Sequence, residues 1–407
     1  MPATMPDEPA PAATVPAAAD DAFGADLYRV LTEQAADIVF SPASVASVLR
    51  MALCGARGQT AAELAGALHL GAAHLGAAHP VAAAQADEAA QADEAAEGLR
   101  GLAALVGDVT ADGAVTLRAP AAVWVQAGLP LAPGFAARLG AAAATVADAD
   151  FAAAPQAARA QINQAVAAQT AGKITGLLPP GAVSSATRLV LTSAIYLKAG
   201  WATTFAEQQT TDAPFYPDGR DGPAATVRMM RGTAARPYLR GEGYQAVVLP
   251  YRDGRLAMAV VLPDGPLAAL GPALAAGGLR ALLAGTARHQ VTLALPKFRL
   301  ETALDLIPVL RRLGVTQAFT AGADFGGITD AARLAVSAVA HKAYIDVDEQ
   351  GTEAAAATGV SFRPLAAFRA PPPVAMTVDR PFLFAIVHTP TGLPLFLGQV
   401  SHPPPRP

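Results

Sequence analysis

The sequence predicts an α+β protein with largely antiparallel sheets, folded as one large domain. Two patterns indicate this class. Helical spacing of apolar residues dominates the first third of the chain, and strand-like apolar runs joined by long connections dominate the rest. Length alone would allow two or three domains in 407 residues, but no linker divides the chain into self-sufficient halves. Apolar types make up 53% of the sequence, which is enough for a large core.

The first elements are predicted to be helices. Residues 1–20 are rich in Ala and Pro and are expected to form a disordered tail, and apolar residues then recur on one helical face over 21–33. A Ser-Pro pair marks the start of a helix over 43–53. Thr60 and Glu63 have the spacing of a capping box and predict the start of a third helix.

Residues 71–97 have a biased composition, in which the string QADEAA occurs twice. We expect a solvated, acidic, Ala-rich insertion there. Strand signals dominate after it, and the Asp253–Gly254 pair predicts a tight hairpin turn. The expected strands are 115–126, 188–198, 246–249, 256–262, 291–295, 333–348, 382–388 and 395–400, and helical patterns remain at 156–178 and 303–313.

The sequence lacks the common signatures of catalysis and cofactor binding. It has no G-x-S-x-G, H-E-x-x-H or G-x-x-x-x-G-K-[ST] motif, so we expect neither an enzyme nor a cofactor. A single cysteine, Cys54, excludes an internal disulfide and a Cys-based zinc site, and the scattered histidines predict no metal site. The net charge of −4 argues against a nucleic-acid or anionic-membrane partner.

The N-terminal region gives no address for the protein. The first basic residue is Arg29, so no signal peptide is visible. We therefore expect a cytoplasmic protein, or a secreted one if a signal was removed before this numbering began. The alanine-rich composition is typical of a GC-rich, microbial genome.

The segment 349–374 is the most unusual part of the chain. It lies between two strand-like stretches, and connections of this length are usually functional or disordered. From Thr352 onward the even positions are uncharged and the first four are small, whereas Glu353 and Arg363 share the odd parity. Alternate side chains of a strand share a face, so residues 352–363 could enter a sheet with one face buried. A mobile, Ala-rich loop would also explain the small residues.

Several long motifs occur in a specific order along the chain. They are FSPASVASVLRMALCGARGQTAAEL at 40–64, INQAVAAQTAGKITGLLPPG at 162–181, LVLTSAIYLKAGW at 189–201, ALPKF at 294–298, AVAHKAYIDVDEQGTEAAAATG at 338–359 and DRPFLFAIVHTPTGLPLFLGQV at 379–400. These motifs resemble those of the serpin family of serine protease inhibitors. The resemblance covers roughly residues 22–403, and EQGTEAAAA at 349–357 is similar to the reactive-loop hinge of inhibitory members.

The resemblance implies the serpin fold, which has three β-sheets, about nine helices and an exposed reactive-centre loop. That loop would be 349–374, within a single domain over 21–403. The implied function is that of a monomeric protease inhibitor acting as a suicide substrate. Its partner would be a target serine protease, which attacks the loop and is trapped as a covalent acyl complex when the cleaved loop inserts into the central sheet of the metastable fold.

The resemblance also assigns residues to three parts of this machinery. Gly351 would give the backbone freedom where the loop turns into the sheet, and Thr352 would be the first side chain buried on insertion. Ser193 stands where the family usually has Asn, which shortens a hydrogen-bond donor. Lys297 and Glu349 would form a surface ion pair contributing under about 1 kcal/mol. The full sets are the hinge (Glu349, Gly351, Thr352, Glu353, Ala354, Ala355, Ala356 and Ala357), the sheet-opening cluster (Ser41, Ser44, Ser193 and His341) and the loop-insertion entry (Lys297, Glu349 and Trp201).

The family's spacing, counted from the hinge glutamate, places the scissile bond between Leu365 and Ala366. A leucine at this position suits a chymotrypsin-, subtilisin- or elastase-like enzyme. An arginine would redirect the target to trypsin-like enzymes, and the long C-terminal side of the loop leaves rival positions at Phe362, Arg363, Phe368 and Arg369. The alternative to an inhibitor is a non-inhibitory serpin that acts as a binding or carrier protein.

Overall fold

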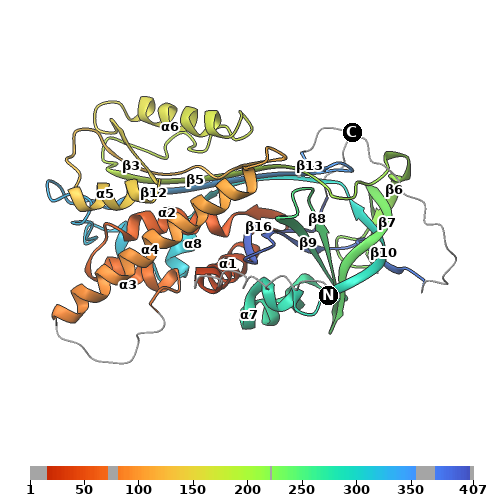
Figure 1. The fold of residues 1–407 in the computed structure, drawn as a ribbon. Coiled ribbons are helices and arrows are strands. Elements are labelled where there is room, and N and C mark those ends of the chain that lie inside the picture. The colour runs from red at the N-terminus through yellow and green to blue at the C-terminus, as the bar shows by residue number, and fades with distance from the viewer. Residues whose placement is uncertain (1–15, 72–80, 221, 354–371, 404–407) are drawn as a thin grey trace, which may run out of the picture.

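The computed structural model describes residues 16–71, 81–220, 222–353 and 372–403. Within these ranges, the chain forms helices α1 to α8 and strands β1 to β16. Figure 1 shows an elongated molecule in which a long sheet runs along one side and a second, strongly twisted sheet fills the other end. The α+β class predicted from the sequence is confirmed.

The seven-stranded sheet contains the two longest buried strands, β5 and β12. Over most of their length these two strands pair directly with each other in parallel. Helix α6 covers one face of this sheet, whereas α2 and α4 lie on the other (Figure 1). In sheet order the strands are β11 (Phe298–Asp305), β12 (Val336–Val347), β13 (Gly351–Thr352), β5 (Leu189–Gly200), β3 (Ala121–Gln126) and β4 (Thr145–Ala149), and β2 (Val115–Arg118) also pairs with β5.

The nine-stranded sheet is continuous because β7 is long enough to pair at both ends. It joins β8 on one side and β10 on the other, so two of the three expected sheets share this strand. In sheet order the strands are β1 (Ile38–Phe40), β16 (Leu393–Val400), β15 (Phe382–His388), β9 (Leu256–Pro263), β8 (Tyr244–Pro250), β7 (Ala225–Gly241), β10 (Ala287–Pro296) and β14 (Val374–Thr377), and β6 (Thr211–Phe215) pairs with β7.

The helices pack around these sheets and bury their apolar stripes. Helix α2 is buried along its whole length, so it forms the centre of the largest hydrophobic cluster. The helices are α1 (Pro16–Thr32), α2 (Pro42–Leu53), α3 (Gly58–Ala67), α4 (Val81–Thr110), α5 (Pro133–Ala141), α6 (Pro155–Gln169), α7 (Gly271–Leu283) and α8 (Ile307–Arg312), with short 3₁₀ helices at Glu207–Gln209, Leu267–Leu270 and Gln317–Phe319.

The expected disordered tail is too long. Residues 1–15 lie outside the described part of the chain, but α1 begins at Pro16 rather than after residue 20. Near the start of this helix, Asp20 is 5% exposed and accepts a hydrogen bond of 2.6 Å from the buried Arg50 of α2. This buried ion pair fixes the start of α1, and Ala/Pro composition alone could not indicate it.

The expected solvated insertion is also wrong for part of its described residues. The repeat lies in α4, and Ala95 and Ala96 are 0% and 1% exposed. Alanines therefore form the buried face of the repeat, and Gly98 lies so close to Arg50 that a Cβ there would be 2.6 Å from the guanidinium Nε. The apolar stripe escapes a periodicity search because it consists of small residues.

The predicted capping box does not form. Helix α3 begins at Gly58, and the Thr60 hydroxyl instead accepts a hydrogen bond of 3.0 Å from the backbone of Asp324. The Glu63 carboxylate accepts backbone hydrogen bonds of 2.7 Å each from Thr316 and Gln317. Both side chains thus tie α3 to a distant loop.

The helical pattern expected over 303–313 is shorter than predicted. Residues 303–305 complete the ladder between β11 and β12, so the only helix in this stretch is α8.

Candidate functional site

The hinge enters the seven-stranded sheet in the intact chain. At one end of the sheet β5 and β12 separate and admit the two-residue strand β13 between them. Gly351 pairs with Gly200, and Thr352 pairs with both Ala199 and Val347. We expected this insertion only after cleavage of the loop, so the resting position of the hinge is a correction. The closed part of the sheet lies directly beyond it.

Gly351 and Thr352 fit this position for different reasons. A Cβ on Gly351 would lie 2.1 Å from the carbonyl oxygen of Ala199, so only glycine permits the close backbone approach. Thr352 is fully buried, and its hydroxyl lies 2.6 Å from the Tyr251 hydroxyl. The buried polar group is therefore satisfied in the resting state.

Glu353 turns the chain out of the sheet. Its φ of 50° is in the left-handed region, which is unusual for a residue with a side chain. Its carboxylate forms an ion pair with Lys173, which follows α6 on the outer face of the sheet. The Glu353 carboxylate raises the pKa of Lys173, and burial together with this carboxylate raises the pKa of Tyr196. The inserted part of the hinge thus ends next to Glu353, whose charged side chain is held by Lys173 from outside the sheet.

The ion pair at the entry is not on the surface, contrary to expectation. Lys297 Nζ lies 2.6 Å from Glu349 Oε2, and the two side chains are only 19% and 8% exposed. The Thr210 hydroxyl donates a hydrogen bond of 2.8 Å to the other carboxylate oxygen. Although burial opposes it, the bonds from Lys297 and Thr210 lower the pKa of Glu349.

Trp201 completes the entry as expected. Its indole Nε1 donates a hydrogen bond of 2.9 Å to the carbonyl of Asp348, and its backbone N–H donates one of 2.8 Å to the carbonyl of Gln350. Its ring stacks on Tyr251 with a centroid separation of 4.6 Å and an interplanar angle of 14°. Tyr251 therefore supports both the indole and the buried Thr352.

The sheet-opening cluster forms beneath the closed part of the sheet. His341 is 0% exposed, and burial lowers its pKa to about 3. The Ser41 backbone N–H donates 3.0 Å to His341 Nε2, so the ring proton lies on Nδ1 and is donated to Ser193 Oγ at 2.8 Å. Ser41 also caps α2 through its bond from Ser44 N. The neutral histidine links β12, β5 and α2.

The serine at 193 retains its bond to His341 despite its short side chain. The neighbouring Ser44 hydroxyl, however, is buried and has no hydrogen-bond partner among the described residues. A buried hydroxyl without a partner costs about 1–3 kcal/mol. The cluster is therefore complete around the histidine and incomplete at Ser44.

The scissile segment itself falls in residues 354–371, which lie outside the described part of the chain. This range includes the predicted bond and its rivals (Leu365, Ala366, Phe362, Arg363, Phe368 and Arg369) and the hinge alanines (Ala354, Ala355, Ala356 and Ala357). Their assignments stay predictions.

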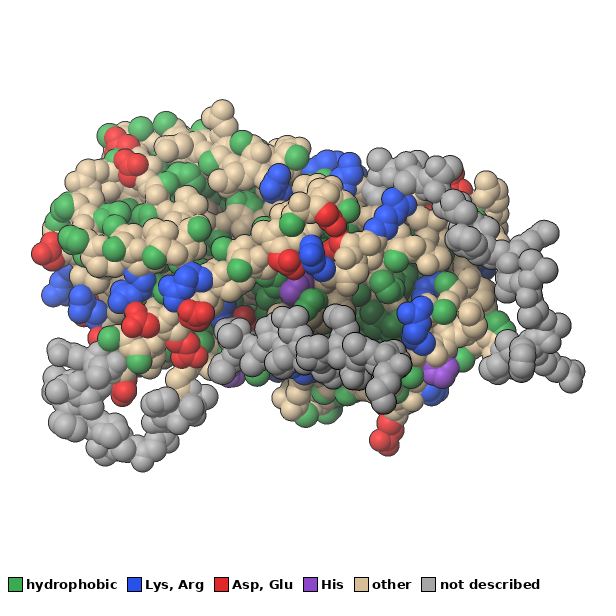
Figure 2. All heavy atoms as spheres, viewed as in Figure 1, with side chains coloured by type: hydrophobic (Ala, Val, Ile, Leu, Met, Phe, Trp, Pro, Cys, Tyr) green, Lys and Arg blue, Asp and Glu red, His purple; other side chains and the backbone are tan. Residues whose placement is uncertain are grey.

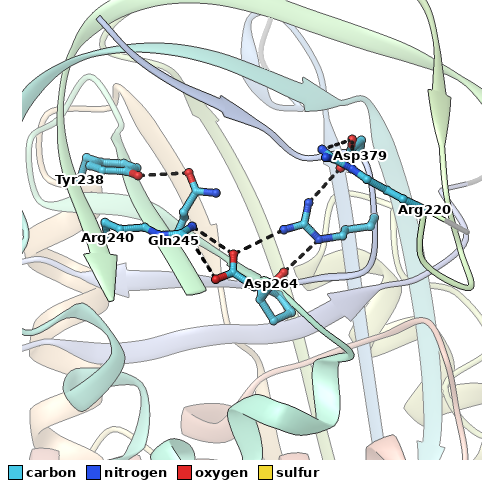
Figure 3. A network of polar contacts seen from close by, with 8 residues as sticks. Arg220, Tyr238, Arg240, Gln245, Asp264 and Asp379 are labelled. Carbon is cyan, nitrogen blue, oxygen red and sulfur yellow. Dashed lines mark hydrogen bonds and ion pairs between the residues drawn. The ribbon is translucent and has the colours of Figure 1, made fainter. Parts of the chain in front are cut away.

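A network of charged side chains holds the chain beyond the loop (Figure 3). Arg380 donates to the Pro263 carbonyl at 3.0 Å and to Asp379 at 3.1 Å, and its guanidinium lies 3.9 Å from Asp264. Asp379 also pairs with Arg220 at 2.6 Å, and Asp264 with Arg240 at 2.8 Å. The DRPF motif contains two of these residues, but their partners are not visible in the sequence.

Besides Thr210, two other site residues were missed. Tyr251 directly follows β8 and bonds Thr352, and Lys173 follows α6 and holds Glu353. Both lie far from the hinge in sequence, so no local pattern could identify them.

Comparison with known proteins agrees with this geometry. A family model described as serpin (serine protease inhibitor) matches residues 18–403. The chain belongs to the serpin family. This serpin is 36% identical to the leukocyte elastase inhibitor of Bos taurus over 402 residues, covering 95% of this chain and 99% of the relative. It is 35% identical to an uncharacterized serpin-like protein of Thermococcus kodakarensis, covering 94% and 84%.

The solved structures extend this likeness to the fold. Human thyroxine-binding globulin in complex with thyroxine superposes with a TM-score of 0.79 at 26% identity, covering 95% of this chain and 98% of that chain. The family and fold implied by the sequence motifs are thus confirmed.

The described residues contain no group of three or more His, Cys, Asp or Glu side chains placed to hold a metal ion. No helix among them has the length and apolar character needed to cross a membrane.

Proposed function

We propose that this serpin inhibits a serine endopeptidase as a suicide substrate. The protease serine attacks the Leu365 carbonyl, the bond to Ala366 breaks, and Leu365 remains joined to the enzyme as an acyl ester. The freed N-terminal part of the loop then extends β13 between β5 and β12. The observation that carries this proposal is β13, which already occupies the start of that path.

The energetics favour completion of the strand once the loop is cut. A strand of ~12 residues paired on both sides gains on the order of 10–20 kcal/mol at about 1 kcal/mol per hydrogen bond. Against this stand the direct ladder from Val336 to Tyr344 and the His341 cluster, which close the sheet below the hinge. In the uncut chain the loop is tethered at both ends, so the gain is not available.

The target is proposed to be chymotrypsin-, subtilisin- or elastase-like. Leucine fits an apolar specificity pocket, and the similar bovine protein is named as an inhibitor of leukocyte elastase. The inhibitor is proposed to act as a monomer.

Incubation with chymotrypsin, subtilisin, an elastase and trypsin tests the function. We expect a complex stable on a denaturing gel with an apolar-specific enzyme, and a released fragment whose mass begins at Ala366. A complex with trypsin alone would move the bond to Arg363 or Arg369. Cleavage by each enzyme without any complex would contradict inhibition of these classes.

The second candidate is a non-inhibitory binding protein. The likeness to thyroxine-binding globulin in complex with thyroxine supports this alternative. The thermal stability of the loop-cleaved protein separates the two. A large rise in melting temperature means that the loop inserts, whereas an unchanged value favours the binding protein.

A further inference from the structure

Three parts of the chain meet at His388, the last residue of β15. Its side chain is 6% exposed, and Nδ1 lies 2.9 Å from the Thr391 hydroxyl in the turn before β16. Nε2 is buried and has no hydrogen-bond partner among the described residues. It lies 4.0 Å from Oδ2 of Asp108, a residue in the last turn of α4, which is too far for a hydrogen bond. The neutral imidazole therefore leaves one ring nitrogen unpaired next to a carboxylate.

Arg255 fastens the end of α4 to the nine-stranded sheet at the same place. Its Nε lies 3.2 Å from Asp108 Oδ2, and its guanidinium donates a hydrogen bond of 2.6 Å to the Asp108 carbonyl. The Arg255 carbonyl in turn accepts a hydrogen bond of 2.7 Å from the backbone of Thr389. Figure 2 shows acidic, basic and histidine side chains close together near the middle of the visible face, where α4 ends in Figure 1. These contacts form one junction between α4, the start of β9 and the turn after β15.

The surroundings of His388 disfavour a proton on its ring. Burial lowers the pKa of His388, Arg255 lowers this pKa further, and Asp108 raises it. Since an exposed histidine has a pKa near 6.5, proton uptake below that pH favours conformations in which this side chain has left the junction. Burial raises the pKa of Asp253, so its protonation has the opposite effect and favours the intact junction. The other charged side chains at the junction are Asp112 and Arg280, and β16 contributes none.

We propose that mild acid releases the end of α4 from the nine-stranded sheet, and that His388 is the group that takes up the proton. One proton from solvent makes both ring nitrogens donors, while Asp108, which is 50% exposed, already pairs with Arg255. An imidazolium held there would be buried beside a second cation with one shared carboxylate, which is costly. The 389–392 turn and the last turn of α4 therefore come apart. This release does not rest on the proposed function, since it needs neither cleavage nor insertion of the loop.

Hydrogen exchange of the full, uncut chain at pH 7.5 and 5.0 tests this release, followed by mass spectrometry and corrected for the intrinsic effect of pH on exchange. Amides in peptides spanning 104–112 and 386–394 should exchange about threefold to thirtyfold faster at pH 5.0. The upper value is the limit for one exposed histidine with a pKa near 6.5. Peptides from α6 should show no change. Equal corrected rates at both pH values in the junction peptides, or the same acceleration in α6, overturn the proposal.

Three variants identify the group that takes up the proton. His388→Gln does not titrate in this range and should lose the acid-dependent part of the exchange. His402→Gln is the matched control, because His402 is 59% exposed and pairs with Asp37, and it should respond as the parent does. Arg255→Gln should exchange faster at pH 7.5, because it removes the anchor, but its ratio between the two pH values should shrink, because the imidazolium then has Asp108 to itself. A parent-like ratio in His388→Gln, or in Arg255→Gln if the first variant fails to fold, overturns the proposal.

Discussion

The two stems of the reactive loop are built in opposite ways. On the N-terminal side, β13 is a two-residue strand that lies where β5 and β12 begin to separate. On the C-terminal side, β14 pairs with β10 over four residues, and the charged network of Arg380 follows directly. Phe382 then enters the core fully buried. In the proposed mechanism the first stem advances into the sheet, whereas the second is held by its pairing with β10 and by the charged network.

For the loop insertion proposed above, this difference sets the direction. A strand can grow only from a stem that already lies between two strands, and Thr352 lies between β5 and β12. The two stems should therefore respond differently to mutation. Changes on the N-terminal side should alter how the cleaved loop is used, and changes on the C-terminal side should alter the stability of the whole domain.

The largest effect is expected for Thr352→Arg. The arginine would need burial against Tyr251 without a partner, which is costly. The hinge should leave the sheet, and the fraction of protease trapped as complex should fall from most to under about a tenth, with cleaved inhibitor as the product. Densitometry of a denaturing gel measures this fraction. Thr352→Ser keeps the hydroxyl and should keep the complex. An unchanged yield in the arginine variant would contradict the assigned direction of insertion.

Arg380→Ala tests the fixed stem. The Arg380 side chain is 12% exposed, and its removal deprives Asp379 and Asp264 of this partner. We expect a loss of about 2–4 kcal/mol in unfolding free energy, as for other broken, largely buried pairs, measured by urea unfolding. The yield of complex with the same protease should not change. A lower yield at unchanged stability would show that this stem also controls the fate of the loop.

The buried histidine of the sheet-opening cluster predicts that the stability of the closed sheet depends on pH. His341 has a folded pKa of about 3 and an ordinary unfolded value near 6.5, so the unfolded or opened state takes up a proton first as the pH falls. The stability of the closed sheet should therefore be complete above about pH 6.5 and decline by up to about 1.4 kcal/mol per pH unit below it. Urea unfolding midpoints from pH 7.5 to 4.5 measure this slope. A histidine-free variant, His341→Asn, should lack this part of the slope, and an equal slope in both proteins would exclude the buried histidine as its cause.

The sequence predicts the parts of this site that its motifs contain. The hinge, the entry residues and the sheet-opening cluster all follow from motif order, and the structure brings the described members of each set together. The sequence does not predict that Gly351 and Thr352 lie in the sheet of the intact chain, because their position depends on the separation of β5 and β12. The buried face of α4 was missed for a simpler reason, since alanines give only a weak apolar period.

Ser193→Asn tests the incomplete part of the cluster. A longer amide can reach toward the Ser44 hydroxyl, which is buried without a partner among the described residues, while keeping the bond to His341. We expect a gain of about 1 kcal/mol in stability and slower entry of a synthetic peptide with the sequence of residues 352–363 into the sheet of the uncut protein. Ser193→Ala should shift both quantities in the opposite direction. A destabilised Asn variant would mean that the packing around the serine has no space for the amide.

The smallest effect is expected for Lys173→Met, which removes the cation that holds Glu353. Because the lysine is 43% exposed, solvent screens the pair and its contribution should stay below about 1 kcal/mol. The carboxylate, only 15% exposed, then loses its cation and favours leaving the sheet, so the hinge should spend more time outside. The loop becomes more accessible, and the rate of association with the protease should rise by less than about fivefold. Lys173→Arg keeps the charge and should keep the rate. A slower rate in the Met variant would show instead that Lys173 assists the entry of the loop.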